Sequence, residues 1–345
     1  MEQIYTPKQD YKVLVRCFTY NHSKYIEDAL NGFAMQKTNF PFACLVMDDC
    51  STDGEQDVIN AWMERECDMT KAEYVDIELS NVILVPHKTN ENCTFAFYLL
   101  KQNLYGTGRK KMNLVWPWRN CCEYESLCEG DDYWIDPMKL SKQVNIFEQN
   151  KDCTLVYSGF KTVDENGVEY SNPLMEKYLQ KGHNGLVFFD LLVNLNFIMT
   201  LTTMVRTRCL KNIPYYYYDY GIFLHCSRQG YCGFIPDIMA SYRNNPSSLM
   251  NTNKDSLLPR FYPTVLNEIK YAINKSDGTY KDIYNHSMFK TIIGYILGRN
   301  VRKSTIKWDF LKLVLRYPSL YYYVIKGIII KMAFESKLRK AVCQY

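Results

Sequence analysis

Cys128-Glu129-Gly130-Asp131-Asp132-Tyr133-Trp134 is the stretch that constrains the fold most, because it places two adjacent carboxylates directly after a glycine. Strand-like residues precede it, and Asp136-Pro137 and a helical pattern follow it. A carboxylate pair at a strand end can hold Mg²⁺ or Mn²⁺ through oxygen ligands, and Gly130 allows the backbone to approach a ligand closely. Alone, such a pair is more often a solvated turn, so the neighbouring elements decide between the two interpretations.

Two apolar runs upstream predict a parallel sheet. Residues 12–18 and 42–47 have the β-branched or continuously apolar character of strands, and apolar residues recur at helical spacing over residues 25–34. Ser23 is the predicted N-cap of that helix. Strands that are apolar on both faces and alternate with helices are typical of a parallel sheet covered by helices, whose ligands lie at the carboxyl ends of the strands.

Three polar clusters follow three of the predicted strands: Thr19-Tyr20-Asn21, Asp48-Asp49 with Ser51, and Glu129 through Asp132. Each alone is typical of an ordinary turn. As an ordered set, residues 18–21 (FTYN), 46–54 (VMDDCSTDG) and 129–134 (EGDDYW) resemble the motifs of the family 2 inverting glycosyltransferases. The resemblance covers roughly residues 10–245. It implies an α/β fold of the GT-A type, a mostly parallel Rossmann-like sheet flanked by helices.

The resemblance also implies roles for individual residues on the donor side. Thr19, Tyr20 and Asn21 would lie beside the nucleotide, where Asp49 would accept a hydrogen bond from the base and Ser51 would assist. Asp131 would face the ribose or the sugar, and Asp132 would hold the metal, Mn²⁺ or Mg²⁺. Lys110, in the cluster of residues 109–111, would meet the diphosphate, although such a charge run is as often a solvated surface.

Later in the chain, the resemblance makes Asp219 the catalytic base, just before a predicted helix. The competing interpretation of Asp219 is a helix N-cap, and one residue can serve both roles. Arg243 would reach the diphosphate, since guanidinium geometry suits phosphate oxygens. Asn244 and Asn245 follow it where many relatives have a histidine, which argues against a histidine metal ligand there.

Two segments depart from the expected pattern. Glu125 is a charge in the strand before the carboxylate pair, so we expect either a shorter strand or a glutamate that lines the cleft. Pro117, between Trp116 and Trp118, argues against an uninterrupted helix. The two tryptophans could stack on a sugar, but anchoring a loop by packing is the more common role.

Composition is consistent with an intracellular enzyme. The 345 residues, 47% of them apolar, are enough for one large core plus an appendage. Thirteen cysteines without a paired framework are typical of reduced thiols in a cytosolic protein, and five scattered histidines argue against zinc. The N-terminus has no signal-like apolar region, and no long uncharged apolar run predicts a membrane span. We therefore expect a cytoplasmic protein.

The C-terminal region is basic. Residues 301–345 carry ten Lys or Arg against Asp309 and Glu335, a local charge of 10 − 2 = +8, whereas the whole chain has a net charge of +4. Aromatic and aliphatic residues alternate with these charges, a pattern that suits an anionic membrane surface. No nucleic-acid motif accompanies it. The alternative is a helical region that packs on the catalytic domain. We expect a domain boundary at residues 249–250, with a catalytic domain over 1–249 and a helical basic region over 250–345.

Together these features predict transfer of a sugar from a nucleotide diphosphate to an acceptor hydroxyl, with inversion, on a carbohydrate or lipid-linked glycan in cell-surface polysaccharide assembly. Two alternatives remain open. A nucleotidyltransferase would need a glycine- and basic-rich loop after the first strand, which residues 18–22 do not offer. A non-catalytic sugar-nucleotide-binding module would have no need of Asp219.

Overall fold

The computed structural model describes residues 4–105, 111–172, 187–188, 191, 197–211, 213 and 219–246. All of them belong to one unit of the chain, formed by residues 1–191 and 196–246. Lys110 and the predicted helical region over 250–345 lie outside the described residues. In the part of the chain that is described, no helix has the length and apolarity needed to cross a membrane.

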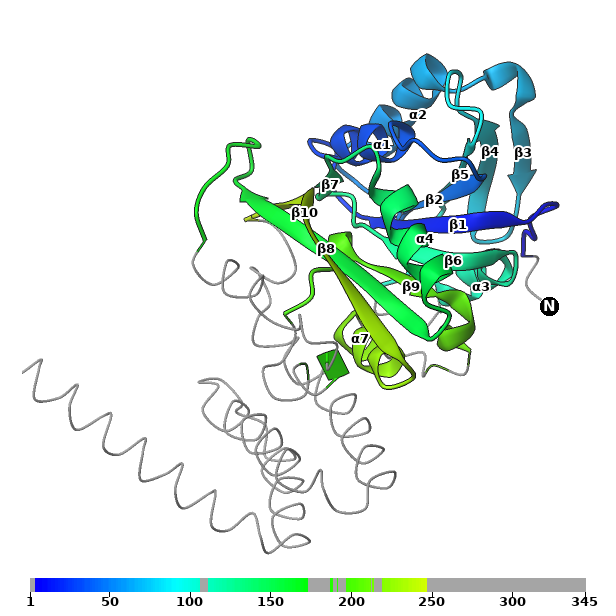
Figure 1. Cartoon of the computed structure of the whole chain (residues 1–345). Helices are drawn as coiled ribbons and strands as arrows, with labels where there is room; N and C mark the ends of the chain where they lie inside the picture. Colours follow the sequence, from blue (N-terminus) through cyan, green and yellow to red (C-terminus); the bar gives the residue numbers. More distant parts are fainter. Residues whose placement is uncertain are drawn as a thin grey trace, which may run out of the picture. The chain divides into compact units, whose positions relative to one another are not determined.

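A sheet of ten strands, in the order β3-β4-β5-β2-β1-β6-β9-β8-β10-β7, forms the centre of this unit (Figure 1). The strands are β1 (Tyr11–Thr19), β2 (Phe42–Asp48), β3 (Glu73–Asp76), β4 (Ser80–Pro86), β5 (Cys93–Leu100), β6 (Cys122–Leu127), β7 (Tyr133–Trp134), β8 (Cys153–Val163), β9 (Met204–Arg206) and β10 (Tyr231–Arg243). β5, β2, β1 and β6 pair in parallel, as do β8 and β10, and the other ladders are antiparallel. This mixed sheet confirms the predicted α/β class.

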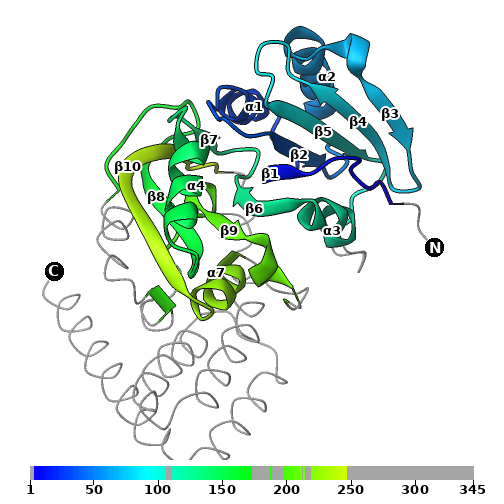
Figure 2. The ribbon, with the colours of Figure 1, turned by 45° about the vertical axis from the view of Figure 1, so that its right-hand side comes forward.

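The described helices are α1 (Ile26–Ala34), α2 (Glu55–Glu66), α3 (Met112–Asn120), α4 (Lys139–Gln149) and α7 (Asp219–Ser227), with the 3-10 turns η1 (Met69–Lys71), η2 (Thr200–Thr202) and η3 (Thr207–Leu210). In Figure 2, α1 lies beside β7 and α4 beside β8, as their contacts require. α1 begins three residues after the predicted N-cap Ser23. The reason is local: residues 23–25 form a turn in which Ile26 N–H donates to His22 O at 2.9 Å.

Successive residues of the central strands feed two separate hydrophobic cores, as expected of a sheet covered on both faces. On one face, Val13 and Val15 of β1 pack in a cluster with side chains of α1, α2 and α4. On the other face, Leu14 packs with side chains of α3. The central strand β2 is therefore buried throughout, and the polar clusters Thr19-Tyr20-Asn21 and Asp48-Asp49 lie at strand ends.

α3 contradicts the expectation that Pro117 interrupts a helix, because it runs through this proline. Tertiary packing outweighs the lost backbone hydrogen bond. Trp118 is fully buried, its ring lies 6.0 Å from that of Tyr5, and its Nε1–H donates to Tyr98 Oη at 2.8 Å. The anchoring role of a tryptophan in this segment is thus the correct one for Trp118.

Glu125 does not shorten β6, and its side chain is not exposed to solvent. It is fully buried, and its carboxylate accepts hydrogen bonds from Arg16 Nε at 2.8 Å and from Arg119 Nη2 at 2.9 Å. Burial raises the pKa of this carboxyl, but the two guanidinium groups outweigh burial and hold it below its usual value. A buried charge is tolerated here because two cations pair with it.

Lys139, the first residue of α4, is fully buried as well. Its Nζ donates to Gln143 Oε1 at 2.8 Å and to Ser126 Oγ at 3.2 Å, and lies 4.2 Å from the centre of the Trp134 ring. None of these partners is a carboxylate. Burial therefore lowers the pKa of Lys139 to about 7, with Cys128 and Asp136 opposing the shift in part.

This lowered pKa predicts a pH dependence of stability. Between about 7 and the usual value of 10.5, the unfolded chain holds a proton on Lys139 that the folded protein has lost. Stability from this group is then complete above 10.5 and declines as the pH falls toward 7. Relative to Lys139→Met, the wild type should gain on the order of 1 kcal/mol per pH unit as the pH rises from 7 to 9. Chemical unfolding at several pH values measures this. Parallel curves for the two proteins would refute it, and Lys142→Met, on the same helix, is the control.

Candidate functional site

The carboxyl ends of β1, β2 and β6 lie side by side, because β1 pairs in parallel with both neighbours. Asp49 N–H donates to Thr19 O at 3.0 Å, and Gly130 N–H donates to Phe18 O at 3.2 Å. The three polar clusters that the sequence places at strand ends thus meet at one edge of the sheet, where open α/β sheets bind their ligands.

Gly130 is required at this edge by a protein contact. A Cβ atom at this position would lie 2.1 Å from Thr19 Oγ1 and 3.1 Å from His22 Nδ1, so any side chain would displace the end of β1. The glycine therefore brings the Glu129–Asp132 loop against Thr19 and His22. The close approach expected of Gly130 is thus made to these side chains of the neighbouring strand end.

Asn21 and Ser51 join the loops after β1 and β2. Asn21 has a left-handed backbone with φ of 57°, and its N–H donates to Ser51 Oγ at 2.8 Å. Its side-chain oxygen accepts from Thr52 N–H at 2.8 Å. Tyr20, the first residue after β1, is 41% exposed. Asn21 and Ser51 are thus engaged in shaping the loops, whereas Tyr20 presents its side chain to solvent.

Glu55 is a member of this edge that the sequence interpretation missed. It is fully buried at the start of α2, and its carboxylate accepts from Thr19 Oγ1, from Ser51 Oγ at 2.8 Å and from His22 N–H at 2.9 Å. Burial raises its pKa. An acidic residue directly after the Asp53-Gly54 turn, in a helix that packs on the sheet, was the available signal in the sequence.

Asp49 is almost fully buried, and both of its carboxylate oxygens have protein partners. Oδ1 accepts from Leu104 N–H at 2.8 Å, and Oδ2 lies 2.5 Å from Lys111 Nζ. The cation of the 109–111 cluster that the structure places at this edge is thus Lys111.

Asp131 and Asp132 point into different surroundings. The Asp132 side chain is buried, and its Oδ1 accepts from Arg243 N–H at 2.8 Å. The Asp131 side chain is 15% exposed, and its Oδ2 lies 3.6 Å from His22 Nε2 and 3.2 Å from Asn245 Nδ2. Of the two carboxylates, Asp131 is the more exposed to solvent.

A divalent cation suits the surroundings of Asp131 better than those of Asp132. Hard cations such as Mg²⁺ are commonly held by one or two carboxylates together with the phosphates of a substrate. Among the described residues there is no cluster of three or more His, Cys, Asp or Glu that would hold a metal alone. Asp131 therefore fits a cation that is shared with a bound diphosphate.

Arg243 is held by protein groups on every side. Its Nε donates to Asp131 O at 3.0 Å, Nη1 donates to Glu165 O at 3.1 Å, and Nη2 pairs with Asp28 Oδ2 at 2.6 Å. The guanidinium also lies 4.8 Å from the centre of the Tyr25 ring. In this arrangement Arg243 fixes the Asp131–Asp132 loop.

Asp219 is an exposed residue at the start of α7. Its Oδ2 accepts from Thr200 Oγ1 at 2.8 Å, so a threonine of η2 orients the carboxylate. Glu129 lies near it: burial raises the pKa of Glu129 to about 7, Arg16 opposes this, and the negative charges of Asp219 and Asp131 add to it. The carboxylates of Glu129 and Asp131, in the loop after β6, and of Asp219, at the start of α7, are therefore close enough to interact electrostatically.

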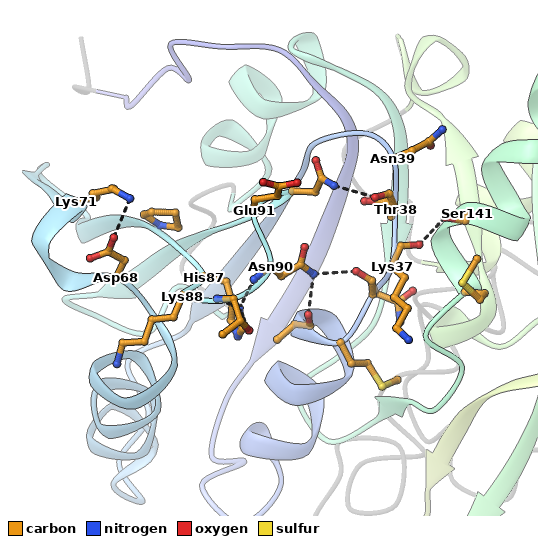
Figure 3. Close-up of a pocket in the computed structure, with 17 residues that line it drawn as sticks. Lys37, Thr38, Asn39, Asp68, Lys71, His87, Lys88, Asn90, Glu91 and Ser141 are labelled. Carbon is orange, nitrogen blue, oxygen red and sulfur yellow. Dashed lines mark hydrogen bonds and ion pairs between the residues drawn. The ribbon is translucent and has the colours of Figure 1, made fainter.

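A hollow of about 1280 Å³ lies away from this edge (Figure 3). Its lining includes residues 34–39 and 86–92, which precede β2 and β5 and therefore lie at the opposite ends of these strands. Its polar side chains bind neighbouring loops, as where Asn90 Nδ2 donates to both Ala34 O and Gln36 O at 2.8 Å. The polar side chains that line this hollow thus hold neighbouring loops together.

Comparisons with known proteins support the fold. No protein-family model matches the chain. The uncharacterized proteins Rv1520 of Mycobacterium tuberculosis and Mb1547 of Mycobacterium bovis are 27% identical to it over 237 residues, which cover 68% of this chain and 59% of each relative. The chain therefore matches less than two thirds of the length of these relatives.

Among solved structures, TarS 1-349 of S. aureus in complex with UDP-GlcNAc has a TM-score of 0.59 and 17% identity, over 96% of this chain and 92% of that one. TarS 1-349 has also been solved without a named ligand, and that structure gives a TM-score of 0.57 with 18% identity over the same shares. At this level of identity the likeness concerns the fold. The mixed α/β sheet flanked by helices is the GT-A fold of glycosyltransferases, as predicted.

Proposed function

We propose that the protein is a family 2 glycosyltransferase that transfers a sugar from a nucleoside diphosphate to an acceptor hydroxyl with inversion. The observation that carries this proposal is the meeting of Asp49, Asp131 and Asp219 at the carboxyl ends of β1, β2 and β6 and the start of α7. In a GT-A fold, this is the edge that suits a nucleotide sugar. The complex of TarS with UDP-GlcNAc supports a uridine diphosphate sugar as the first donor to test.

Asp219 is the proposed catalytic base. It removes the proton of the acceptor hydroxyl while the oxygen forms a bond to the anomeric carbon and the bond to the diphosphate breaks. A single displacement inverts the anomeric centre and needs no second carboxylate as a nucleophile. General base catalysis of this kind is worth about 10²–10⁴ in rate. Thr200 holds the Asp219 carboxylate through the 2.8 Å hydrogen bond and so fixes the direction in which it accepts the proton.

Asp131 is the proposed ligand of Mn²⁺ or Mg²⁺, in place of Asp132, which the sequence interpretation favoured. The exposure of Asp131 and the engagement of Asp132 by Arg243 N–H support this choice. When bound, the cation supplies positive charge for the leaving diphosphate. The chain contributes the fixed loop: Arg243 holds the Asp131 carbonyl, and Gly130 holds the loop against Thr19.

On the donor side, we propose that Tyr20 and Asp49 contact the base. Thr19, Asn21 and Ser51 would shape the pocket through their loop hydrogen bonds. Lys110 remains a proposed diphosphate contact, with the neighbouring Lys111 beside Asp49. Arg243 is assigned to positioning because its three nitrogen atoms already donate to protein oxygens.

The test is incubation of the full chain with UDP- and GDP-sugars and Mn²⁺ or Mg²⁺, followed by measurement of free nucleoside diphosphate. Release that depends on the sugar nucleotide and falls in Asp219→Asn is the expected result. Binding of a nucleoside diphosphate without any release, even with glycan acceptors added, would instead identify a sugar-nucleotide-binding module.

We also propose that the basic C-terminal residues attach the protein to an anionic membrane on the cytoplasmic side, where a lipid-linked glycan in polysaccharide assembly would be the acceptor. The net charge of +8 over residues 301–345 supports this. Each Lys or Arg near such a surface adds about 1 kcal/mol of attraction, which salt screens. The full chain should sediment with phosphatidylserine vesicles, less so in high salt, and a chain ending at Arg299 should not. Equal sedimentation of both chains would contradict the proposal.

A further inference from the structure

Lys139 has three neighbours around its Nζ atom, and each of them also binds the backbone of one short segment. The neighbours are the hydroxyl of Ser126, the amide of Gln143 and the ring of Trp134. Ser126 Oγ donates to Thr203 O at 2.9 Å, Gln143 Nε2 donates to Thr202 O at 2.8 Å, and Trp134 Nε1 donates to Leu201 O at 2.9 Å. One buried lysine amine thus organises the donors to three consecutive carbonyl groups.

That segment is η2 with the residue after it, and it carries the residue that touches the proposed base. Thr203 Oγ1 donates to Thr200 O at 2.8 Å and closes the turn. Thr200 Oγ1 in turn donates to Asp219 Oδ2 at 2.8 Å. A path of hydrogen bonds, joined by the covalent atoms of Thr203 and Thr200, therefore runs from Lys139 through Ser126 to the Asp219 carboxylate.

Packing alone does not explain a lysine at this position. The site is fully buried, and a methionine of similar length would fill it without the cost of burying an amine. The amine instead donates one hydrogen bond to Ser126 Oγ and another to Gln143 Oε1, which leaves the Ser126 hydroxyl and the Gln143 amide to donate to η2 and Thr203. Loss of Nζ would free the Gln143 amide and the Ser126 hydroxyl to rotate.

We propose that Lys139 is a positioning residue for catalysis. It orders the 200–203 turn through Ser126 and Gln143, and the ordered turn fixes the orientation of the Asp219 carboxylate. This inference rests on the proposed function, since it assigns a role relative to Asp219. It extends that function by placing a determinant of turnover in a buried helix residue that touches neither donor nor acceptor.

The kinetic test compares Lys139→Met with Lys142→Met, a lysine of the same helix that pairs with Asp136 and Asp237. Lys139→Met should lower kcat by roughly tenfold or more and leave the KM for the donor within about twofold. Lys142→Met should leave both unchanged. Thr200→Val cuts the path at its other end, so adding Lys139→Met to Thr200→Val should lower kcat by less than about twofold further. Independent, multiplying effects would overturn the proposal.

Hydrogen exchange separates this inference from the proposed function. The amides of Thr202 and Thr203 donate to Met199 O at 3.0 Å and to Thr200 O at 3.1 Å. In Lys139→Met they should exchange at least about tenfold faster than in the wild type, while amides of β2 keep their rates. Unchanged exchange in the turn would refute the positioning role. A wild type that uses no nucleotide sugar would refute the proposed function, and exchange would still decide whether Lys139 orders the turn.

Discussion

Asp219→Asn is expected to lower sugar transfer about a hundredfold or more, while the affinity for the donor stays within about twofold. Asparagine keeps the size of the side chain and can still accept the hydrogen bond from Thr200 Oγ1, but it cannot take up a proton at neutral pH. Turnover and donor binding, measured separately on the same preparation, check this. The expected split between them follows from a residue that acts only in the chemical step.

Asp237→Asn is a suitable control, because Asp237 is an exposed aspartate that pairs with Lys142 on the surface. Unchanged turnover in Asp219→Asn would move the base elsewhere. Glu129 would be the next candidate, since its pKa of about 7 is near the value that suits a general base at neutral pH. Equal losses of donor binding and turnover would show that Asp219 supports the fold at the start of α7.

The second large effect is expected from Asp131→Asn. Removal of the only charge on this side chain should abolish transfer and remove the Mn²⁺-dependent part of nucleoside diphosphate binding. A ligand at 100 times its dissociation constant stabilises a protein by about 2.7 kcal/mol, so the loss should be visible in thermal shifts recorded with UDP, with and without Mn²⁺.

Asp132→Asn is the matched control for this experiment. Burial raises the pKa of Asp132, with the neighbouring Asp131 adding to the effect, so a neutral amide suits its site. Asparagine can still accept from Arg243 N–H, whereas Asp132→Ala leaves that donor unpaired at a cost of about 1–3 kcal/mol. Loss of the Mn²⁺ effect in Asp132→Asn, with its retention in Asp131→Asn, would restore the metal role to Asp132.

The sequence predicted β1, β2, the strand before the carboxylate pair and the edge where the polar clusters meet, because apolar periodicity and motif order depend on local residues. It assigned the metal to Asp132 and the ribose or sugar to Asp131, whereas we propose Asp131 as the metal ligand. This proposal depends on Arg243 N–H, whose hydrogen bond to Asp132 joins residues 111 positions apart. Local patterns carry no information on such a partner.

Buried polar groups were also beyond the sequence patterns. Glu55 and Lys139 are charged residues at helix starts, where solvent exposure is usual, yet both are fully buried. Their burial follows from loops and turns that pack over the helix starts, with partners such as Thr19 and Ser126 in distant strands. The prediction that Pro117 interrupts a helix was wrong for a similar reason, because tertiary contacts of α3 outweigh local propensity.

The contact of Arg243 with Asp28 has a consequence for how this protein is made. The two residues are separated by 215 positions, so the pair can close only after nearly the whole unit has left the ribosome. Contacts between such distant residues are slow to form, and domains fold as units during synthesis from the N-terminus. The nascent chain would hold β1, β2 and β6 long before β10 arrives to lock the Asp131 loop. Assembly of the catalytic edge is therefore tied to the last strand of the unit, and a prematurely terminated chain would carry its motifs without a working site.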